Sequence, residues 1–234
     1  FLWIHYFDPH SDYSPPEPYR SRFADAPYDG EIAYTDSELE RLFDAMPADR
    51  PGLRIAPGDA ARLSACRAIH DDVRHLIGSA ARPVRALLFD KRDASNWALG
   101  WHQDRTICVK QRVDLPGFGP WTVKQGIDHV EPPFDLLARM LTVRIHIDAV
   151  DIENAPLRIA LGSYANGLIP ESDIALQVER SEIHECLAQA GDVWVYRTPI
   201  LHASERAAVG RRRRVLQVDY SGDSLPDGLS WFYD

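Results

Sequence analysis

The chain has 234 residues, of which 45% are hydrophobic and 26% are charged, so its composition is that of a globular domain with a sizeable core. Its 35 acidic and 26 basic side chains give a formal net charge of −9, which disfavours nucleic acid and anionic membranes as partners. Three scattered cysteines exclude a disulfide framework, and no apolar run approaches the roughly 18 residues of a membrane span. We therefore expect a cytoplasmic protein that acts on a small molecule, with its oligomeric state left open.

The N-terminal part of the sequence predicts an arm followed by helices. Residues 1–35 are rich in Pro, Tyr and Asp and include YSPPEPYR, which indicates an extended arm with polyproline-like character. In TDSELERLFDAM, Ser37 and Glu40 have the spacing of a capping box, which predicts the start of a helix. A second helix is expected from about residue 59 to 77. A single domain of residues 36–234 would then follow the arm.

After Pro83 the sequence consists of short segments rich in β-formers, separated by turn residues. They read VRALLF, TICVK, LTVRIHIDAV, LRIAL, DVWVYR and RVLQVDY. One more helix is expected near 173–179. Helices followed by many short strands predict an α+β fold with a sandwich or barrel, of which the jelly roll is one solution. The stretch 115–133 is rich in Gly and Pro and is predicted to be a long binding loop, with His129 and Glu131 as a weak metal signal.

A His and an Asp two residues apart can hold one metal ion, and this pattern occurs four times. The pairs are His10/Asp12, His70/Asp72, His102/Asp104 and His146/Asp148. On a strand, residues i and i+2 point to the same side, whereas on a helix they point apart. The pair in the predicted second helix therefore fails on geometry, and the pair in the arm has no rigid scaffold. The other two pairs fit locally.

A third ligand favours one of these two pairs. A facial triad needs a second His, and His202 directly follows the predicted strand DVWVYR. A sandwich brings early strands against late ones, and more strands separate His202 from Asp104 than from Asp148. We therefore favour His102, Asp104 and His202 as metal ligands. A hydrogen-bonded structural histidine remains the alternative for each ring.

Four consecutive arginines begin the last predicted strand, GRRRRVLQVDY. Strand alternation places Arg213 on a polar face with Gln217 and Asp219, while Arg212 and Arg214 lie on the opposite face. A guanidinium that points into a cavity near a metal is suited to hold a carboxylate through two parallel hydrogen bonds. The alternative is a solvated or nucleic-acid-binding patch.

At these residues the chain resembles the phytanoyl-CoA dioxygenase family of iron(II)/2-oxoglutarate oxygenases, over roughly residues 83–220. The similarity rests on WHQD at 101–104, ENAPLRIALGSY at 153–164, AGDVWVYRTPILHAS at 190–204 and RRVLQVDY at 213–220. The resemblance implies a double-stranded β-helix, which is a cupin-like jelly roll, with N-terminal helices packed on the outer face of a sheet.

The resemblance also implies the chemistry of the site. His102, Asp104 and His202 would ligate Fe(II) and act in catalysis, while Arg213 and Ser204 would bind the distal carboxylate of 2-oxoglutarate. The co-substrates 2-oxoglutarate and O2 would take the open positions on the iron, and a substrate would be hydroxylated or otherwise oxidised with release of succinate and CO2. Related halogenases carry a small residue in place of the carboxylate, so the presence of Asp104 favours hydroxylation.

The sequence says little about the substrate. The family pattern NGPL…PGSH reads NAPL…LGSY here, with Ala155, Leu161 and Tyr164 as the departures, and these departures leave the substrate class open. The candidates for substrate contact are Lys91, Arg105, Arg144 and Arg158, each of which is more often exposed or salt-bridged in proteins, and Trp121 of the predicted loop.

Two other functions remain open at this point. One is a cupin-like enzyme that uses a divalent metal without 2-oxoglutarate and does not need Arg213. The other is an inactive binding module on the same fold, against which the complete set of three ligands argues.

Overall fold

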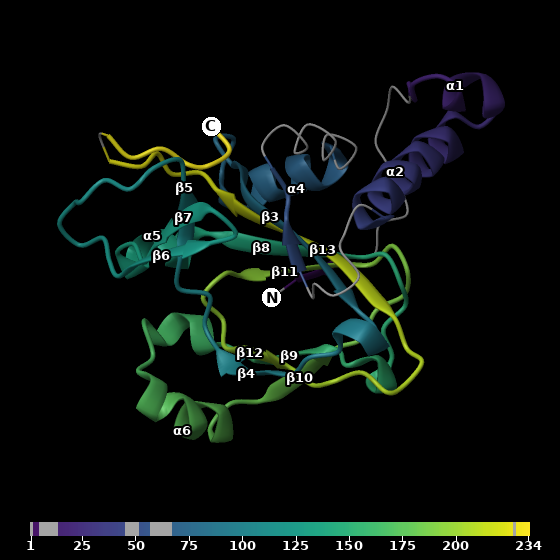
Figure 1. Ribbon diagram of the computed structural model, residues 1–234. Coiled ribbons are helices and arrows are strands. Elements are labelled where there is room, and N and C mark those ends of the chain that lie inside the picture. Colours follow the sequence, from purple (N-terminus) through teal and green to yellow (C-terminus); the bar gives the residue numbers. More distant parts are fainter. Residues whose placement is uncertain (1, 5–13, 45–51, 57–66, 227) are drawn as a thin grey trace.

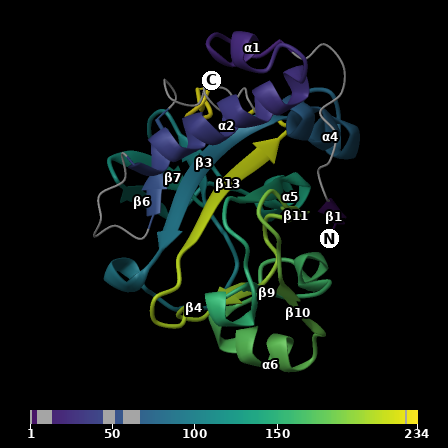
Figure 2. The ribbon, with the colours of Figure 1, turned by 90° about the vertical axis from the view of Figure 1, so that its right-hand side faces the viewer.

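A computed structural model of the chain describes residues 2–4, 14–44, 52–56, 67–226 and 228–234. Two antiparallel sheets face each other, and the N-terminal helices lie against the outer face of the larger one (Figures 1 and 2). Among the described residues, none of the helices combines the length and the apolar character that crossing a membrane requires.

The larger sheet has six strands. Their order is β1 (Leu2–Ile4), β11 (Val193–Arg197), β8 (Leu141–His146), β13 (Arg213–Ser221), β3 (Arg82–Lys91) and β2 (Gly52–Arg54). The smaller sheet has the order β10 (Ile183–Cys186), β9 (Leu157–Ala160), β12 (His202–Ser204) and β4 (Leu99–His102). The chain passes repeatedly from one sheet to the other, an arrangement consistent with a jelly-roll or cupin-like fold.

A third, three-stranded sheet is inserted between β4 and β8. It has the order β5 (Ile107–Val109), β7 (Ile127–Val130) and β6 (Trp121–Lys124). The prediction of a structureless loop over 115–133 is therefore wrong for 121–130. Gln125 and Gly126 both have positive φ, at 53° and 77°, and such a residue pair closes a tight hairpin turn.

Helices lie at the N-terminus and at the connections between strands. They are α1 (Tyr19–Arg22), α2 (Pro27–Asp44), α4 (Arg67–Ile77), α5 (Phe134–Arg139) and α6 (Ile174–Glu179). Short 3-10 turns are η2 (Asp93–Ser95), η3 (Ile152–Asn154), η4 (Ser163–Asn166) and η5 (Glu171–Asp173). The helices expected at 173–179 and up to 77 are confirmed over 174–179 and 67–77, while 59–66 lie outside the described residues.

The prediction of an extended arm up to residue 35 is wrong for 19–22 and 27–35, which are helical. Pro27 begins α2 because proline suits the first turn of a helix. Ser37 therefore lies inside the helix, where its Oγ donates to the carbonyl of Tyr34 at 2.7 Å instead of capping an end. Of the remaining arm, 2–4 form the edge strand β1, and 1 and 5–13 lie outside the described residues.

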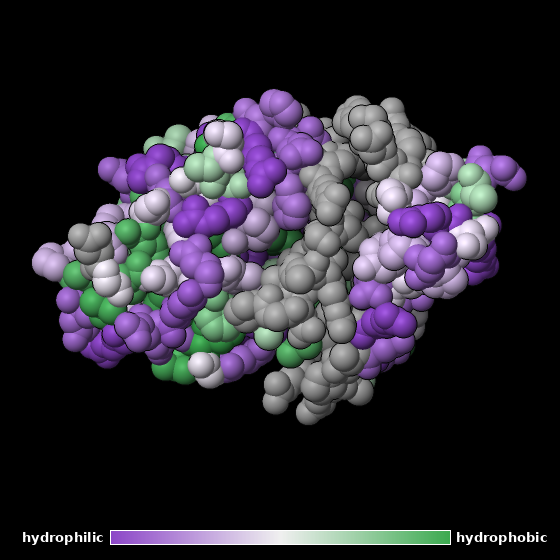
Figure 3. All heavy atoms as spheres, turned by 90° about the horizontal axis from the view of Figure 1, so that it is seen from above, coloured by the Kyte–Doolittle hydropathy of each residue, from purple (hydrophilic) through white to green (hydrophobic). Residues whose placement is uncertain are grey.

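The main apolar core lies between the larger sheet and its helices, not between the two sheets. Phe43 of α2 and Val73 of α4 pack on outward-facing residues such as Leu88, Val143 and Leu216, which confirms that the helices cover the outer face. Seen from above, the described surface over this layer is mainly hydrophilic (Figure 3). The inner faces of β3, β8 and β13 are consequently free to carry polar residues toward the smaller sheet.

Candidate functional site

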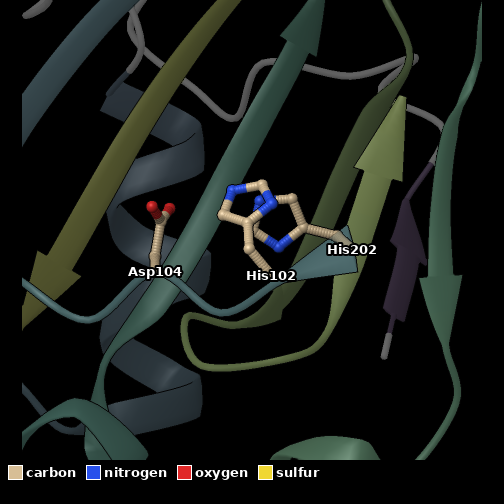
Figure 4. Close-up of side chains that lie close together, drawn as sticks. All are labelled: His102, Asp104 and His202. Carbon is tan, nitrogen blue, oxygen red and sulfur yellow. The ribbon is translucent and has the colours of Figure 1, made fainter. Parts of the chain in front are cut away.

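His102, Asp104 and His202 come together between the two sheets (Figure 4). His102 and His202 lie directly opposite each other on β4 and β12, with ring centroids 4.2 Å apart. One ligand atom from each of the three residues lies within 4.8 Å of the other two, and the described residues hold no other such group. Two imidazoles and one carboxylate with this spacing form a facial set for a divalent metal.

Both rings are oriented for metal binding. Nδ1 of His102 lies 2.8 Å from the carbonyl of Gly100, and Nδ1 of His202 lies 3.0 Å from that of Ile200. A carbonyl accepts only from an N–H, so each ring carries its proton on Nδ1 and presents the lone pair of Nε2 to the metal. Burial lowers the pKa of His202 to about 4, which keeps this ring neutral at pH 7.

The carboxylate of Asp104 is held by an ion pair with Arg85. Burial alone would raise its pKa, but the charge of Arg85 outweighs burial and helps to hold the pKa well below its usual value. Arg85 Nη2 donates to Asp104 Oδ2 at 3.0 Å, and the same guanidinium pairs with buried Asp219. Asp104 is therefore ionised, with one oxygen bound to Arg85 and the other available to a metal.

Gln103, between the two ligands, anchors the turn in which Asp104 lies. Its Nε2 donates to the carbonyls of Pro199 at 2.8 Å and Gly167 at 3.1 Å, and its Oε1 accepts from the N–H of Ile169 at 2.9 Å. The side chain is 4% exposed. Asp104 lies beyond the end of β4, where its backbone has no neighbouring strand among the described residues to hold it. The hydrogen bonds of the Gln103 side chain fix the backbone there instead, and with it the position of the Asp104 carboxylate. The one signal of this role in the sequence is a polar residue between two ligands, and it did not enter the prediction of the site.

A cavity of about 200 Å³ opens beside the three ligands and extends along the inner face of the larger sheet. Arg213, whose inward direction strand alternation predicts, and Ser204 both line it. Arg213 is 3% exposed and donates from Nη1 to the carbonyl of Ala155 and to Ser204 Oγ at 3.4 Å, while its Nε has no partner among the described residues. Lys91, buried next to them, donates to the same Ser204 Oγ at 3.0 Å.

These cations repel one another. Burial, followed by the charges of Arg213 and Arg144, lowers the pKa of Lys91 to about 7. Burial and Arg144 lower that of Arg213 to about 9. Within the described part of the chain, none of the three forms an ion pair, and Arg144 donates to the neutral amide oxygen of Gln217 at 2.8 Å. Buried charges without partners are costly, so this end of the cavity favours an anion.

The other three arginines of the run point elsewhere. Arg212 pairs with Asp90 at 2.9 Å, Arg214 pairs with Asp148 at 2.7 Å, and Arg211 pairs with Glu153 and Asp151. The predicted phase of the last strand is therefore correct.

The remaining candidates lie away from the three ligands. Asp148 forms an ion pair with Arg214, and His146 is buried near Arg144. This pair therefore does not join the three candidate metal ligands. His129 is fully buried, with Nδ1 2.9 Å from the carbonyl of Ile127 and Nε2 3.0 Å from Cys108 Sγ, so it forms no metal pair with Glu131.

Of the proposed substrate contacts, Arg144 lines the cavity, and Lys91 lies behind Ser204. Trp121 instead packs in the core of the three-stranded sheet. Arg105 donates to the carbonyl of Ile169, and Arg158 pairs with Glu205. These three residues do not line the cavity, since each is held in a contact elsewhere, and their contact with a substrate stays a prediction.

No family model matches the sequence, and no curated protein matches it. Solved structures share its fold. EctD from S. alaskensis in its apoform is 16% identical over 94% of this chain and 84% of its own, with a TM-score of 0.59. SnoN, a non-heme alpha ketoglutarate dependent epimerase from nogalamycin biosynthesis, is 15% identical over 85% and 81%, with a TM-score of 0.53. HygX from Streptomyces hygroscopicus, solved with nickel and 2-oxoglutarate, is 17% identical over 86% and 80%, with a TM-score of 0.53. At these identities the likeness concerns the fold alone.

Proposed function

We propose that the chain is a non-haem Fe(II)- and 2-oxoglutarate-dependent dioxygenase, built on a double-stranded β-helix, that hydroxylates or otherwise oxidises a small-molecule substrate with release of succinate and CO2. One observation carries the proposal: the three candidate ligands and the cations of Arg144 and Arg213 border the same small cavity, and the Lys91 ammonium donates to Ser204 in its wall. A metal ion and a carboxylate-bearing ligand fit these two ends together.

The donor set fits Fe(II). Two neutral imidazoles and one ionised carboxylate on one side leave the other side of the ion open. Bound Fe(II), together with 2-oxoglutarate and O2, supplies the oxidising chemistry, and the protein supplies placement and exclusion of water. Arg85 occupies one oxygen of Asp104 and so favours ligation through the other. The carboxylate also fills the position that a halide would need, which favours hydroxylation over halogenation.

The cationic end orients the co-substrate. Arg213 offers a planar fork with a free Nε–H, and the Ser204 hydroxyl and the Lys91 ammonium lie beside it. Such groups bind a carboxylate with charge-assisted hydrogen bonds. Holding the distal carboxylate there directs the keto-acid end toward His102 and Asp104. Lys91, expected to meet the substrate, is thus reassigned to the co-substrate.

The fold neighbours agree with these cofactors but not with one reaction. HygX was solved with 2-oxoglutarate, and SnoN is an alpha ketoglutarate dependent epimerase. The reaction class therefore rests on Asp104 and the cavity of this chain. Its acidic surface supports a small-molecule substrate over nucleic acid or a membrane.

An anaerobic titration tests the proposal. Fe(II) followed by 2-oxoglutarate should produce the weak visible charge-transfer band of the chelate, and air should then yield succinate. His202→Ala should bind neither. Metal binding without the band would favour the cupin-like enzyme that does not use 2-oxoglutarate. Absence of metal binding would favour a binding module.

A further inference from the structure

The outer part of the cavity carries two further cations that the proposed chemistry does not use. Arg54 is the last residue of β2 and pairs with Leu87 of β3, so it shares the inner face of the larger sheet. Lys124 is the last residue of β6. Both line the cavity that contains His102 and Asp104.

A side-chain amide fastens the β6–β7 hairpin to β2 and thereby places Lys124 near Arg54. Gln125, at the hairpin turn, accepts from the N–H of Arg54 at 3.1 Å and donates to the carbonyl of Gly52 at 3.1 Å. The guanidinium of Arg54 is also fixed, because its Nε donates to Nε2 of His129 at 3.3 Å. Two strands distant in sequence therefore hold these cations in a defined arrangement.

The charge on the cavity wall exceeds what the metal and 2-oxoglutarate require. Among the described residues, the basic ones that line it are Arg54, Arg85, Lys124, Arg144 and Arg213, and Asp104 is the one carboxylate. Arg85 is neutralised by Asp104 and Asp219. A divalent metal and the dianion of 2-oxoglutarate neutralise each other. Arg54 and Lys124 form no ion pair within the described residues, and burial followed by the charge of Arg54 lowers the pKa of Lys124.

Apolar residues line the cavity alongside these cations. Trp97 is half-buried, and Leu99, just before His102 on β4, is 45% exposed. A cavity that an exposed leucine, a tryptophan and these two cations line together suits an amphipathic ligand.

We propose that the substrate is an organic anion whose carboxylate or phosphate binds Arg54 and Lys124, while its apolar body lies against Trp97 and Leu99. This inference rests on the proposed function, because it names the substrate class of that same site. Recognition at Arg54 and Lys124 places the anionic group at the cavity wall, away from Arg213, and leaves the apolar body to reach the metal.

Calorimetric titration of the anaerobic protein, loaded with Fe(II) and saturating 2-oxoglutarate, tests this assignment. The probes are phenylphosphate, phenylacetate and the neutral 2-phenylethanol. Both anions should bind, and the neutral probe should bind at least about tenfold more weakly, since a charge-assisted hydrogen bond contributes about that factor or more. Tighter binding of phenylphosphate would identify a phosphate group as the natural anion, and tighter binding of phenylacetate would identify a carboxylate.

Variants locate the anion. Arg54→Gln and Lys124→Gln should each raise the Kd of the preferred anion about 3- to 30-fold, and Arg54→Lys should restore most of the affinity. The matched controls Arg180→Gln and Lys110→Gln change exposed cations that do not line the cavity and should leave it unchanged.

Two results would overturn the assignment. One is equal binding of neutral and anionic probes. The other is a loss of 2-oxoglutarate binding in Arg54→Gln or Lys124→Gln, which would make these residues part of the co-substrate site. Failure of the proposed function is distinguishable, because 2-oxoglutarate would then fail to bind the unmodified protein, while the anion titrations of metal-free protein would still report on Arg54 and Lys124.

Discussion

Replacing Arg213 with Met should stabilise the empty protein while weakening its binding of 2-oxoglutarate. Burial, followed by the charge of Arg144, lowers the pKa of Arg213 to about 9 in the folded protein. Each pKa unit below the ordinary value of an arginine corresponds to about 1.4 kcal/mol. Because the folded-state pKa is depressed, the charge lowers the free energy of unfolding at every pH below about 9, and this penalty disappears as the pH rises from 9 toward the ordinary pKa of arginine. Met removes the charge but also the hydrogen bonds to Ala155 and Ser204, so we expect a net gain of about 1–3 kcal/mol.

Thermal unfolding and calorimetry measure the two effects separately. The gain should raise the Tm by about 2–4 °C per kcal/mol for a chain of this size. Arg213→Lys keeps the charge but loses the fork, and should raise the Kd for 2-oxoglutarate about 10- to 100-fold, as expected from about 1.5–3 kcal/mol for a charge-assisted pair. Arg212→Lys and Arg214→Lys are matched controls, since both residues pair outside the cavity. A destabilised Met variant with an unchanged Kd would refute the reasoning and make Arg213 a structural residue.

Three further outcomes are expected. Asp104→Ala should abolish substrate oxidation, with or without added chloride, while circular dichroism shows an unchanged fold; turnover at the wild-type rate would contradict the ligand assignment. The pKa of Lys91 near 7 implies that the Kd for 2-oxoglutarate rises by up to about tenfold per pH unit above pH 7, and a Lys91→Met variant whose Kd depends on pH in the same way would exclude Lys91. Gln103→Leu should leave buried carbonyls unsatisfied at a cost of about 1–3 kcal/mol each and weaken Fe(II) binding; a metal affinity equal to that of the exposed control Gln189→Leu would show that the amide does not position Asp104.

Strand periodicity explains why part of the site was predictable from the sequence. Residues two apart on a strand share a face, so the inward direction of Arg213 and the outward direction of Arg212 followed from the sequence alone. The grouping of His102, Asp104 and His202 was predictable from ligand type and chain order. The outward direction of Asp148 was not, because it depends on an ion pair with Arg214 that forms only when β8 and β13 lie side by side.

The rest of the site depends on contacts between distant segments. Arg85 on β3 of the larger sheet pairs with Asp219 of the neighbouring strand β13 and also with Asp104, which follows β4 of the smaller sheet. Arg54 and Lys124 meet through the Gln125 amide, which joins a two-residue hairpin turn to the edge of a sheet. No local pattern marks such a contact. The start of α2 was missed for a different reason, since Pro27 was interpreted as part of a proline-rich arm although proline also suits a first helical turn.

The two sheets carry different parts of the candidate site. The histidine ligands stand on the smaller sheet, and the cations of Lys91, Arg144 and Arg213 stand on the larger one. Ile159 packs against Trp194 and Tyr196 between the two sheets. The thickness of this packing therefore sets the distance between the histidine ligands and the cations proposed to hold 2-oxoglutarate. Removing one methyl group from this packing, as in Ile159→Val, should leave the affinities for the metal and for 2-oxoglutarate nearly unchanged. It should alter how the metal and 2-oxoglutarate are aligned with each other. We expect the defect to appear as 2-oxoglutarate consumed without product, a loss of coupling measured as the ratio of succinate to oxidised substrate.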